Sequence, residues 1–191
     1  MRSTTNTKQK LIDATRQMID NDGIQSVSLR EIGNKARLSR SAVYRHFKSK
    51  EDLLSAIVLE DFQTLKETIN HIIGHTDDPF ETVAAIMKGY YTFGIDNPER
   101  YRLLFCREFN KKQYPDIHRA AFDIFETVMK CIAKAQAQDR IIGKSASELT
   151  AMVYAFVHGL ALLNIAGHTE SKKGLDNPYV LINSFLGMLK V

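Results

Sequence analysis

The sequence is poor in the features that mark disulfide frameworks, secretion signals and catalytic sites. Its two cysteines, Cys106 and Cys131, lie within helical patterns, so we expect two small buried side chains in a reducing compartment. Residues 1–10 are polar and lack the apolar core of a signal peptide, which favours a cytoplasmic location. A Gly-rich phosphate loop, a nucleophile elbow, an HExxH motif and a paired-cysteine motif are missing, which argues against an enzyme.

Alternating apolar and polar residues, the mark of a half-buried β-strand, do not occur over any useful length. Three Asp-Pro or Asn-Pro pairs instead place an N-cap residue before a proline at the first helical position: Asp78-Pro79, Asn97-Pro98 and Asn177-Pro178. Ser145 and Glu148 offer a further capping box. These patterns predict an all-α chain of about nine helices, with a small N-terminal head and a larger helical body.

Residues 28–47 have the pattern of two short helices joined by a tight turn. Ser28 and Glu31 can close a capping box at the start of the first helix. One apolar stripe at spacings of three and four follows: Leu29, Ile32 and Ala36. Arg30 and Lys35 lie off this stripe, which leaves their face of the helix free for phosphates.

The second helix of this pattern follows a turn made by Arg37 and Leu38. Ser39 is placed to cap it, and its buried contacts are expected at Val43 and Phe47. The positions predicted to project away from these two are Arg40, Ser41, Ala42, Arg45 and His46. Arg, Ser and His side chains can hydrogen-bond to base edges in a major groove about 12 Å wide. The pattern therefore predicts a helix-turn-helix that binds double-stranded DNA, with Arg40 and Arg45 as candidates for sequence specificity.

Charge is distributed unevenly along the chain. Residues 1–50 hold eleven Lys or Arg against four acidic residues, a net charge of +7, whereas the remaining residues hold fifteen basic and eighteen acidic side chains, a net charge of −3. The total of +4 therefore conceals a basic head on a mildly acidic body. This asymmetry favours nucleic acid as the partner of the head, although a run of basic residues taken alone is often only a solvated face.

The first 60 or so residues resemble the DNA-binding domain of the TetR (tetracycline-repressor-type) family. Besides the helix-turn-helix, the resemblance rests on an amphipathic first helix that ends at Asp22-Gly23, on the segment YRHF at residues 44–47 and on the segment KSKEDLL at residues 48–54. Two positions depart from the family pattern: Arg37 stands where a glycine usually makes the turn, and Gly33 stands where alanine is common. Arg37 must therefore tolerate the backbone angles of that turn.

The resemblance implies a set of DNA contacts. It assigns phosphate contacts to Tyr44 and Lys50, and it gives Arg30 a DNA-facing counterpart. Together with the residues inferred from the pattern, the predicted DNA-binding residues are Ser28, Arg30, Arg37, Ser39, Arg40, Ser41, Ala42, Tyr44, Arg45, His46 and Lys50. We accordingly predict a DNA-binding domain over residues 1–50 and a ligand-binding and dimerisation domain over residues 51–191, connected by a helix at about residues 50–74.

Residues 149–169 contain no Lys, Arg, Asp or Glu, which predicts a helix from 147 to about 167 that is buried nearly all round. The polar Asn164 and His158 within this stretch disfavour a membrane span. A second subunit would complete the burial, and the closing helix offers a matching apolar face: Val180, Leu181, Phe185, Leu186 and Leu189. The segment YAFVHGLALL and residues 97–105 resemble the Trp-His-Gly type of TetR C-terminal domain, which implies a homodimer formed through the last two helices.

Aromatic and soft side chains accumulate on the expected inner helices of the body. Plain core packing accounts for most such stripes, but the family binds small molecules within the body, so the candidate ligand-binding residues are Met87, Tyr90, Tyr91, Phe105, Phe122, Phe125, Tyr154 and His158. Few of these are polar, which favours a largely apolar or aromatic effector. His71 and His75 share a helical face, but no third ligand is identifiable, so neither a metal nor another cofactor is expected.

Together these inferences predict a sequence-specific transcriptional regulator. The expected form is a dimeric repressor that a small molecule releases from a pseudo-palindromic operator, because two short recognition helices related by a two-fold axis read two half-sites. Two alternatives stay open. One is a DNA-bound nucleoid or division-control protein that acts through protein contacts, and the other is a ligand-dependent activator.

Overall fold

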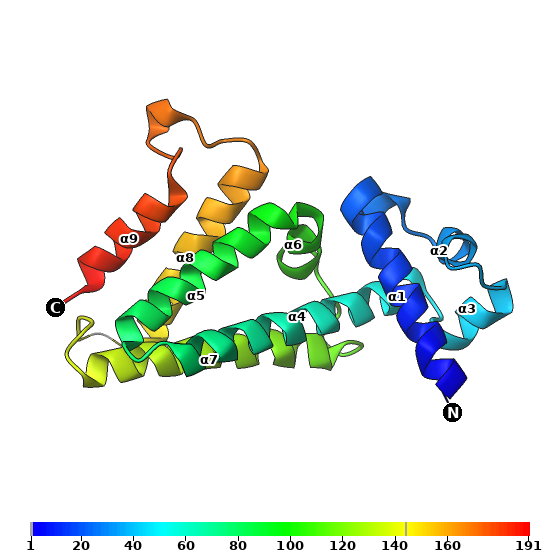
Figure 1. The fold of residues 1–191 in the computed structure, drawn as a ribbon, viewed down its shortest axis with the longest axis horizontal. Helices are drawn as coiled ribbons and strands as arrows, with labels where there is room; N and C mark the ends of the chain where they lie inside the picture. Colours follow the sequence, from blue (N-terminus) through cyan, green and yellow to red (C-terminus); the bar gives the residue numbers. More distant parts are fainter. Residues whose placement is uncertain (1, 144) are drawn as a thin grey trace. The chain divides into compact units, whose positions relative to one another are not determined.

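The computed structural model describes residues 2–143 and 145–191, with side chains from residue 7 onward. These residues form nine α-helices and two 3-10 helices (Figure 1): α1 (Arg2–Asp22), η1 (Ile24–Ser26), α2 (Leu29–Lys35), α3 (Arg40–His46), α4 (Lys50–His75), α5 (Pro79–Asp96), α6 (Pro98–Phe105), α7 (Pro115–Ala137), α8 (Ala146–Ile165), η2 (Ser171–Lys173) and α9 (Pro178–Leu189). The only strand-like pairing among them is an isolated bridge between Ile141 and Lys190. The prediction of an all-α fold with about nine helices is confirmed.

The chain forms two compact units. Unit 1 comprises the described part of Met1–Gln63 together with Asn97–Ala120, and unit 2 comprises Thr64–Asp96 and Ala121–Val191. Helices α4 and α7 run through both units, and α6 belongs to the same unit as the helix-turn-helix. The functional division near residue 50 stays a prediction.

Capping explains where several helices begin. The Asp78 carboxylate accepts a hydrogen bond from the Phe80 N–H at 2.8 Å, and the Asn177 side chain accepts one from the Val180 N–H at 3.2 Å. Helices α6 and α8 also start where expected, but the Asn97 and Ser145 side chains make no capping hydrogen bond. The predicted Ser145 capping box is therefore wrong.

The core of unit 1 joins the first three helices. Leu11 and Ile19 of α1 are fully buried, as is Ile32 of α2, and Val43 of α3 is nearly so. Gly33 lets α2 approach α3 closely, because a Cβ at this position would lie 3.0 Å from Cγ2 of Val43. This packing fixes α3 on the other two helices while its outer face stays exposed.

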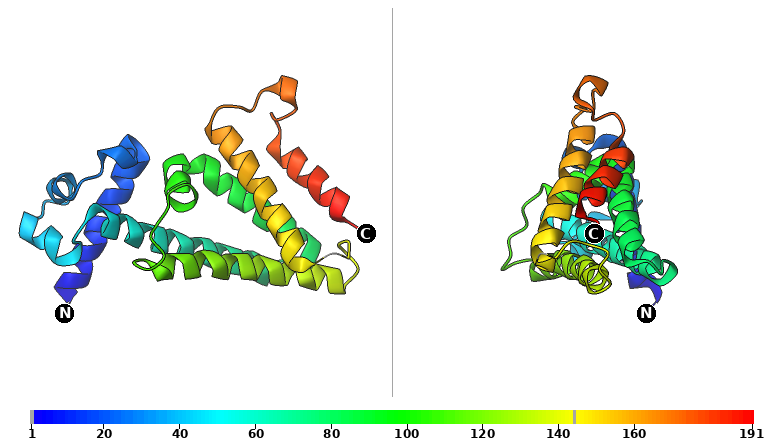
Figure 2. Two further views of the ribbon diagram at one scale, coloured as in Figure 1. Left: turned by 180° about the vertical axis from the view of Figure 1, so that it is seen from behind. Right: turned by 90° about the vertical axis from the view of Figure 1, so that its left-hand side faces the viewer.

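In unit 2, α5 lies beside α8, and α9 also contacts α5 (Figure 2). The Tyr91 ring meets the Tyr179 ring of α9 edge to face at 5.5 Å, and Phe156 of α8 stacks on Phe185 of α9 at 4.2 Å. Aromatic contacts of this kind add about 0.5–1.5 kcal/mol each beyond their buried area. The last two helices are thereby joined to each other and to α5.

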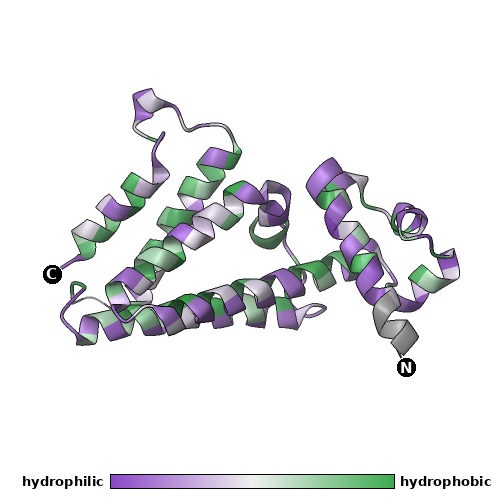
Figure 3. Cartoon of the chain, viewed as in Figure 1, coloured by the Kyte–Doolittle hydropathy of each residue, from purple (hydrophilic) through white to green (hydrophobic). Residues whose placement is uncertain are grey.

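Helix α8 differs from the prediction of near-complete burial. Apolar residues are spread along both α8 and α9 (Figure 3), yet only 33 % of the most apolar stretch of α8 is buried, and Met152, Tyr154 and Leu163 are exposed. Within the described chain, α8 is the one helix long and apolar enough to cross a bilayer, a test that core helices of soluble proteins also pass. The single chain covers one face of α8 and leaves the other uncovered.

The two cysteines also differ. Cys131 is buried, as predicted, and burial raises the pKa of its thiol. Cys106 is exposed, so the prediction for this residue is wrong. It is the C-cap residue of α6, where the chain leaves the helix.

Candidate nucleic-acid interface

Helix α2 and the turn after it have the predicted local structure. The Ser28 hydroxyl accepts a hydrogen bond from the Glu31 N–H at 3.2 Å and so caps α2. Arg37 occupies the left-handed region with φ of 55°, which explains why glycine is common at this position in the family. The turn closes with a hydrogen bond from the Leu38 N–H to the Gly33 carbonyl at 2.9 Å.

Helix α3 presents a short polar face. The Ser39 hydroxyl accepts a hydrogen bond from the Ala42 N–H at 3.3 Å, which caps the helix as predicted. Four predicted DNA-binding side chains are exposed on it: Arg40, Ser41, Tyr44 and Arg45. His46 is half-buried. Ala42 requires a correction, because its side chain is 6 % exposed and packs in the core of the head instead of projecting outward.

Two arginines of this region, Arg30 and Arg40, are exposed to solvent and make surface contacts. The Arg40 guanidinium lies 5.3 Å from the centre of the Tyr44 ring, so a cation–π contact holds the two residues together at the start of α3. Arg30 is 86 % exposed and pairs with the neighbouring Glu31, at 3.1 Å, which is a weak surface contact. A phosphate group can replace Glu31 at little cost.

Lys50 is bound within the protein. Its Nζ donates a hydrogen bond to the Ile24 carbonyl at 2.8 Å, so the amine links the start of α4 to η1. Burial, together with the charge of Arg107, lowers the pKa of Lys50. Its predicted phosphate contact is untested, and any such contact would share the amine with this carbonyl.

The segment after α6 is fixed to the start of α4. Arg107 pairs with Glu51 at 2.6 Å, and the Tyr114 hydroxyl donates to Asp52 at 2.9 Å. Burial raises the pKa of the Tyr114 hydroxyl. Asp52 also accepts a hydrogen bond from the Lys48 N–H, at 3.1 Å, in the link between α3 and α4. Sequence reasoning missed the contacts of Arg107 and Tyr114 because each joins residues more than fifty positions apart.

Four of the predicted ligand-binding residues form one aromatic cluster in unit 2. The Tyr90 hydroxyl lies 3.1 Å from Nδ1 of His158, and the Tyr154 ring stacks on the His158 ring at 5.2 Å. Phe125 of α7 contacts Tyr154 edge to face at 6.5 Å. Burial lowers the pKa of His158, which favours its neutral form. This aromatic cluster offers ring faces and a few neutral polar atoms.

The other predicted ligand-binding residues have different surroundings. Met87 and Tyr91 are fully buried in unit 2, and Phe122 is 62 % exposed, which is unexpected for a residue assigned to an inner helix. Phe105 belongs to unit 1, where its ring contacts Tyr101 at 4.8 Å and Phe62 at 5.8 Å. Their ligand-binding roles are untested.

The histidine pair at the end of α4 has the geometry of a local contact. The rings of His71 and His75 lie 4.0 Å apart, and Nδ1 of His75 lies 2.8 Å from the His71 carbonyl. Among the described residues, no group of three or more His, Cys, Asp or Glu side chains is arranged to hold a metal ion.

Comparison with known proteins identifies both parts of the chain. The family model for bacterial regulatory proteins of the tetR family matches residues 11–57, and the model for the tetracyclin repressor-like C-terminal domain matches residues 83–179. The first match contains α2, α3 and the turn between them. The second contains the aromatic cluster around His158.

Individual relatives agree with these matches. The nicotine-responsive transcriptional repressor HdnoR of Paenarthrobacter nicotinovorans is 37 % identical over 76 residues, which cover 40 % of this chain and 39 % of HdnoR, so the chain spans well under half of that relative. The nucleoid occlusion factor SlmA of Vibrio campbellii is 24 % identical over 133 residues, 68 % of each protein.

Among solved structures, a protein of unknown function from Rhodococcus sp. RHA1 superposes with a TM-score of 0.83 at 20 % identity, over 97 % of this chain and 96 % of that one. At this identity the likeness concerns the fold alone. The C-terminal family model by itself covers more than half of the chain, and the N-terminal model covers the helix-turn-helix. The chain therefore belongs to the TetR family of bacterial regulatory proteins.

Proposed function

We propose that this protein is a sequence-specific DNA-binding transcriptional regulator, a dimeric repressor that a small molecule releases from its operator. Residues 1–50 read the DNA, and residues 51–191 dimerise and bind the effector. The observation that carries the proposal is the exposed face of α3, where Arg40, Ser41, Tyr44 and Arg45 project from a helix that Ser39 caps. The protein acts in the cytoplasm, needs no cofactor and is not an enzyme.

The test is selection of the purified protein against a random duplex library at a stated salt concentration, because phosphate contacts make affinity salt-dependent. Enrichment of a two-fold-symmetric site is the expected result, since each short recognition helix reads one half-site. Selection that enriches no sequence would overturn the proposal.

Dimerisation through α8 and α9 is supported by the apolar residues that the single chain leaves uncovered on them. Met152 is 41 % exposed and Val180 is 53 % exposed. Burial of such a face against a second copy gives a four-helix interface, which also removes the apolar surface from water. Met152→Glu and Val180→Glu should each yield a monomer in sedimentation velocity. Phe122→Glu, on a residue of α7 that is 62 % exposed, is the control and should stay dimeric.

The effector is proposed to be a small molecule that is largely apolar or aromatic. The aromatic cluster supports this class, because Tyr90, Tyr154 and His158 provide ring faces with neutral polar atoms and, in that group, no charged side chain. The relative HdnoR is described as nicotine-responsive, and nicotine belongs to this class. In a thermal-shift screen, neutral ring compounds should stabilise the protein. Stabilisation by strongly charged metabolites alone would contradict this assignment.

A second candidate function is a DNA-bound protein that acts through protein contacts. The similarity to the nucleoid occlusion factor SlmA over 68 % of the chain favours it. Many scattered genomic sites, with an affinity that no small molecule changes, would distinguish it from a ligand-released repressor. A ligand-dependent activator differs only in where the operator lies relative to the promoter, which mapping of the bound sites decides.

A further inference from the structure

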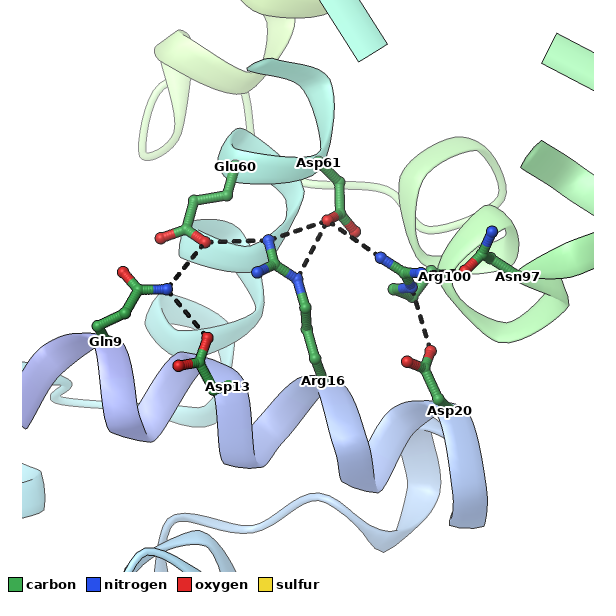
Figure 4. Close-up of polar contacts among 8 residues, drawn as sticks. All are labelled: Gln9, Asp13, Arg16, Asp20, Glu60, Asp61, Asn97 and Arg100. Carbon is green, nitrogen blue, oxygen red and sulfur yellow. Dashed lines mark hydrogen bonds and ion pairs between the residues drawn. The ribbon is translucent and has the colours of Figure 1, made fainter. Parts of the chain in front are cut away.

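Three helices of unit 1 meet at a charged cluster that the DNA-binding surface does not explain (Figure 4). Asp61 of α4 is 3 % exposed, and its Oδ1 accepts hydrogen bonds from Nε and Nη2 of Arg16 on α1, at 3.2 and 3.0 Å. Arg100 of α6 places Nη1 3.5 Å from the same oxygen and Nε 3.1 Å from Oδ1 of Asp20 on α1. Arg100 thus contacts both other helices.

The first turn of α6 directs the Arg100 side chain. Asn97 precedes this helix, and its side-chain oxygen accepts a hydrogen bond from Nη2 of Arg100 instead of capping α6. The guanidinium is 20 % exposed, and while Nη2 donates to Asn97 the same planar group forms ion pairs with one carboxylate on α1 and one on α4. A lysine has a single ammonium group and does not reproduce this geometry.

Burial of such a cluster is a poor source of stability. Taking charges out of water costs several kcal/mol per ion, roughly what their mutual attraction returns. Burial raises the pKa of Asp61 although Arg16 and Arg100 oppose the shift, and its Oδ2 has no hydrogen-bond partner among the described residues. These charged contacts are directional but contribute little net folding stability. They are therefore better suited to fixing one arrangement of the helices than to stabilising the fold.

We propose that Arg100 is a positioning residue that fixes α1, and with it the helix-turn-helix, against α4 and α6. Helix α1 contacts both η1 and α2, so a rotation of α1 carries the recognition surface with it. In the dimeric DNA reader proposed above, on which this inference rests, the contact narrows the range of half-site spacings that the protein accepts.

The chain offers a matched control on the same helix. Arg102 is also on α6, but it pairs with Glu99 of that helix and is 46 % exposed. Arg102→Gln therefore removes the same charge from α6 and leaves the contacts of Arg100 with α1 and α4 in place. Asp20→Asn breaks the Arg100 contact to α1 alone and leaves the bond between Arg16 and Asp61 in place.

The experiment compares operators that carry the selected half-sites at the preferred spacing and at spacings one or two base pairs shorter or longer. For the wild type and Arg102→Gln we expect a strong preference for one spacing. For Arg100→Gln and Asp20→Asn the ratio of affinities between the best and the next spacing should fall about five-fold or more. An unchanged ratio in both variants would overturn the proposal.

Folding and the proposed function are tested separately. Circular dichroism at the assay temperature shows whether Arg100→Gln is folded, and if it is not, Asp20→Asn decides the result. If the wild type enriches no paired half-sites, the proposed function fails. The role of Arg100 is then tested by hydrogen–deuterium exchange of the full chain. Faster exchange at the end of α1 in Asp20→Asn than in Arg102→Gln supports it, and equal exchange overturns it.

Discussion

A buried ion pair joins helices of unit 1 in addition to ring contacts such as Phe62 with Phe105, whereas the ring contacts of unit 2 are accompanied by an exposed ion pair between helices. Asp61, at 3 % exposure, links α4 to α1, while the ion pairs between helices of unit 2 lie nearer the surface, as Lys66 with Asp123 shows at 38 and 40 % exposure. In unit 2, aromatic rings meet across helices, for example Tyr90 of α5 with Tyr154 of α8 at 6.2 Å.

The difference matches the tasks proposed for the two units. Charged hydrogen bonds depend strongly on distance and angle, so they fix one geometry, which a reader of base edges requires. Ring contacts tolerate small shifts of packing, which suits a body that accommodates a ligand or a second copy. Each prediction below alters one side of this comparison.

The largest effect is expected from Arg16→Met. This change leaves the buried Asp61 carboxylate without its two shortest hydrogen bonds, and such a loss costs about 3–5 kcal/mol of unfolding free energy at neutral pH. Lys66→Met breaks the exposed pair of unit 2 and should cost about 0–1 kcal/mol. Urea unfolding of both variants measures the contrast, and equal losses would contradict it.

The pH dependence of Arg16→Met provides a second check on the same site. Burial already raises the pKa of Asp61, and removing Arg16 raises it further. A carboxyl group with a higher pKa in the folded state binds its proton more tightly when the protein is folded. The loss of unfolding free energy caused by Arg16→Met is therefore complete at neutral pH and becomes smaller as the pH falls through the raised pKa of Asp61. Stability should therefore recover toward acidic pH.

The next effect concerns DNA. Arg45→Ala should cost about 1–3 kcal/mol of discrimination at one base position in each half-site, because we propose that the exposed Arg45 side chain contacts a base edge. Lys50→Ala should lower the affinity for all DNA sequences alike, and it also removes the hydrogen bond to the Ile24 carbonyl. Binding to a set of singly substituted operators separates the two. A change of preferred sequence in Lys50→Ala but not in Arg45→Ala would reverse the roles.

A smaller effect is expected at the helix caps. Ser39→Ala removes the hydrogen bond to the Ala42 N–H and should cost about 1 kcal/mol. Ser145→Ala, at the start of α8, removes no capping bond and should leave the melting temperature nearly unchanged. Thermal unfolding of the two variants, followed by circular dichroism, tests this assignment. The assignment of the caps is wrong if Ser145→Ala lowers the melting temperature more than Ser39→Ala does.

The smallest effect is a change in the pH dependence of the unfolding free energy, caused by His158 in unit 2. Burial lowers the pKa of His158 below its usual 6.5, so the unfolded chain takes up this proton more readily and stability falls as pH drops below about that value. The slope is opposite in sign to the one expected from Asp61. His158→Gln should remove it, whereas His168→Gln, on an exposed residue, should not. Unfolding free energies measured across this pH range decide the matter.

Local signals predicted the caps of α2 and α3 and the exposed positions of α3. Ser28 and Ser39 were identifiable as caps because a cap depends on a residue three positions away, and the exposed positions of α3 follow from helical periodicity. Ala42 shows the limit of this reasoning, because tertiary packing of α3 leaves its side chain only 6 % exposed. The Asp61 site had a signal that went unused: an acidic residue on the apolar stripe of Ile57, Val58, Phe62 and Leu65.

The sequence by itself determined the helices, the helix-turn-helix, the basic head and the apolar character of α8 and α9, because each depends on neighbours within a few residues or on composition. The tertiary structure alone decided that α6 joins the unit of the DNA-binding head, that Arg100 meets Asp20 and Asp61, and that Tyr90 meets His158. Those contacts join residues 39 to 80 positions apart, and no local periodicity specifies which distant helix faces pack together.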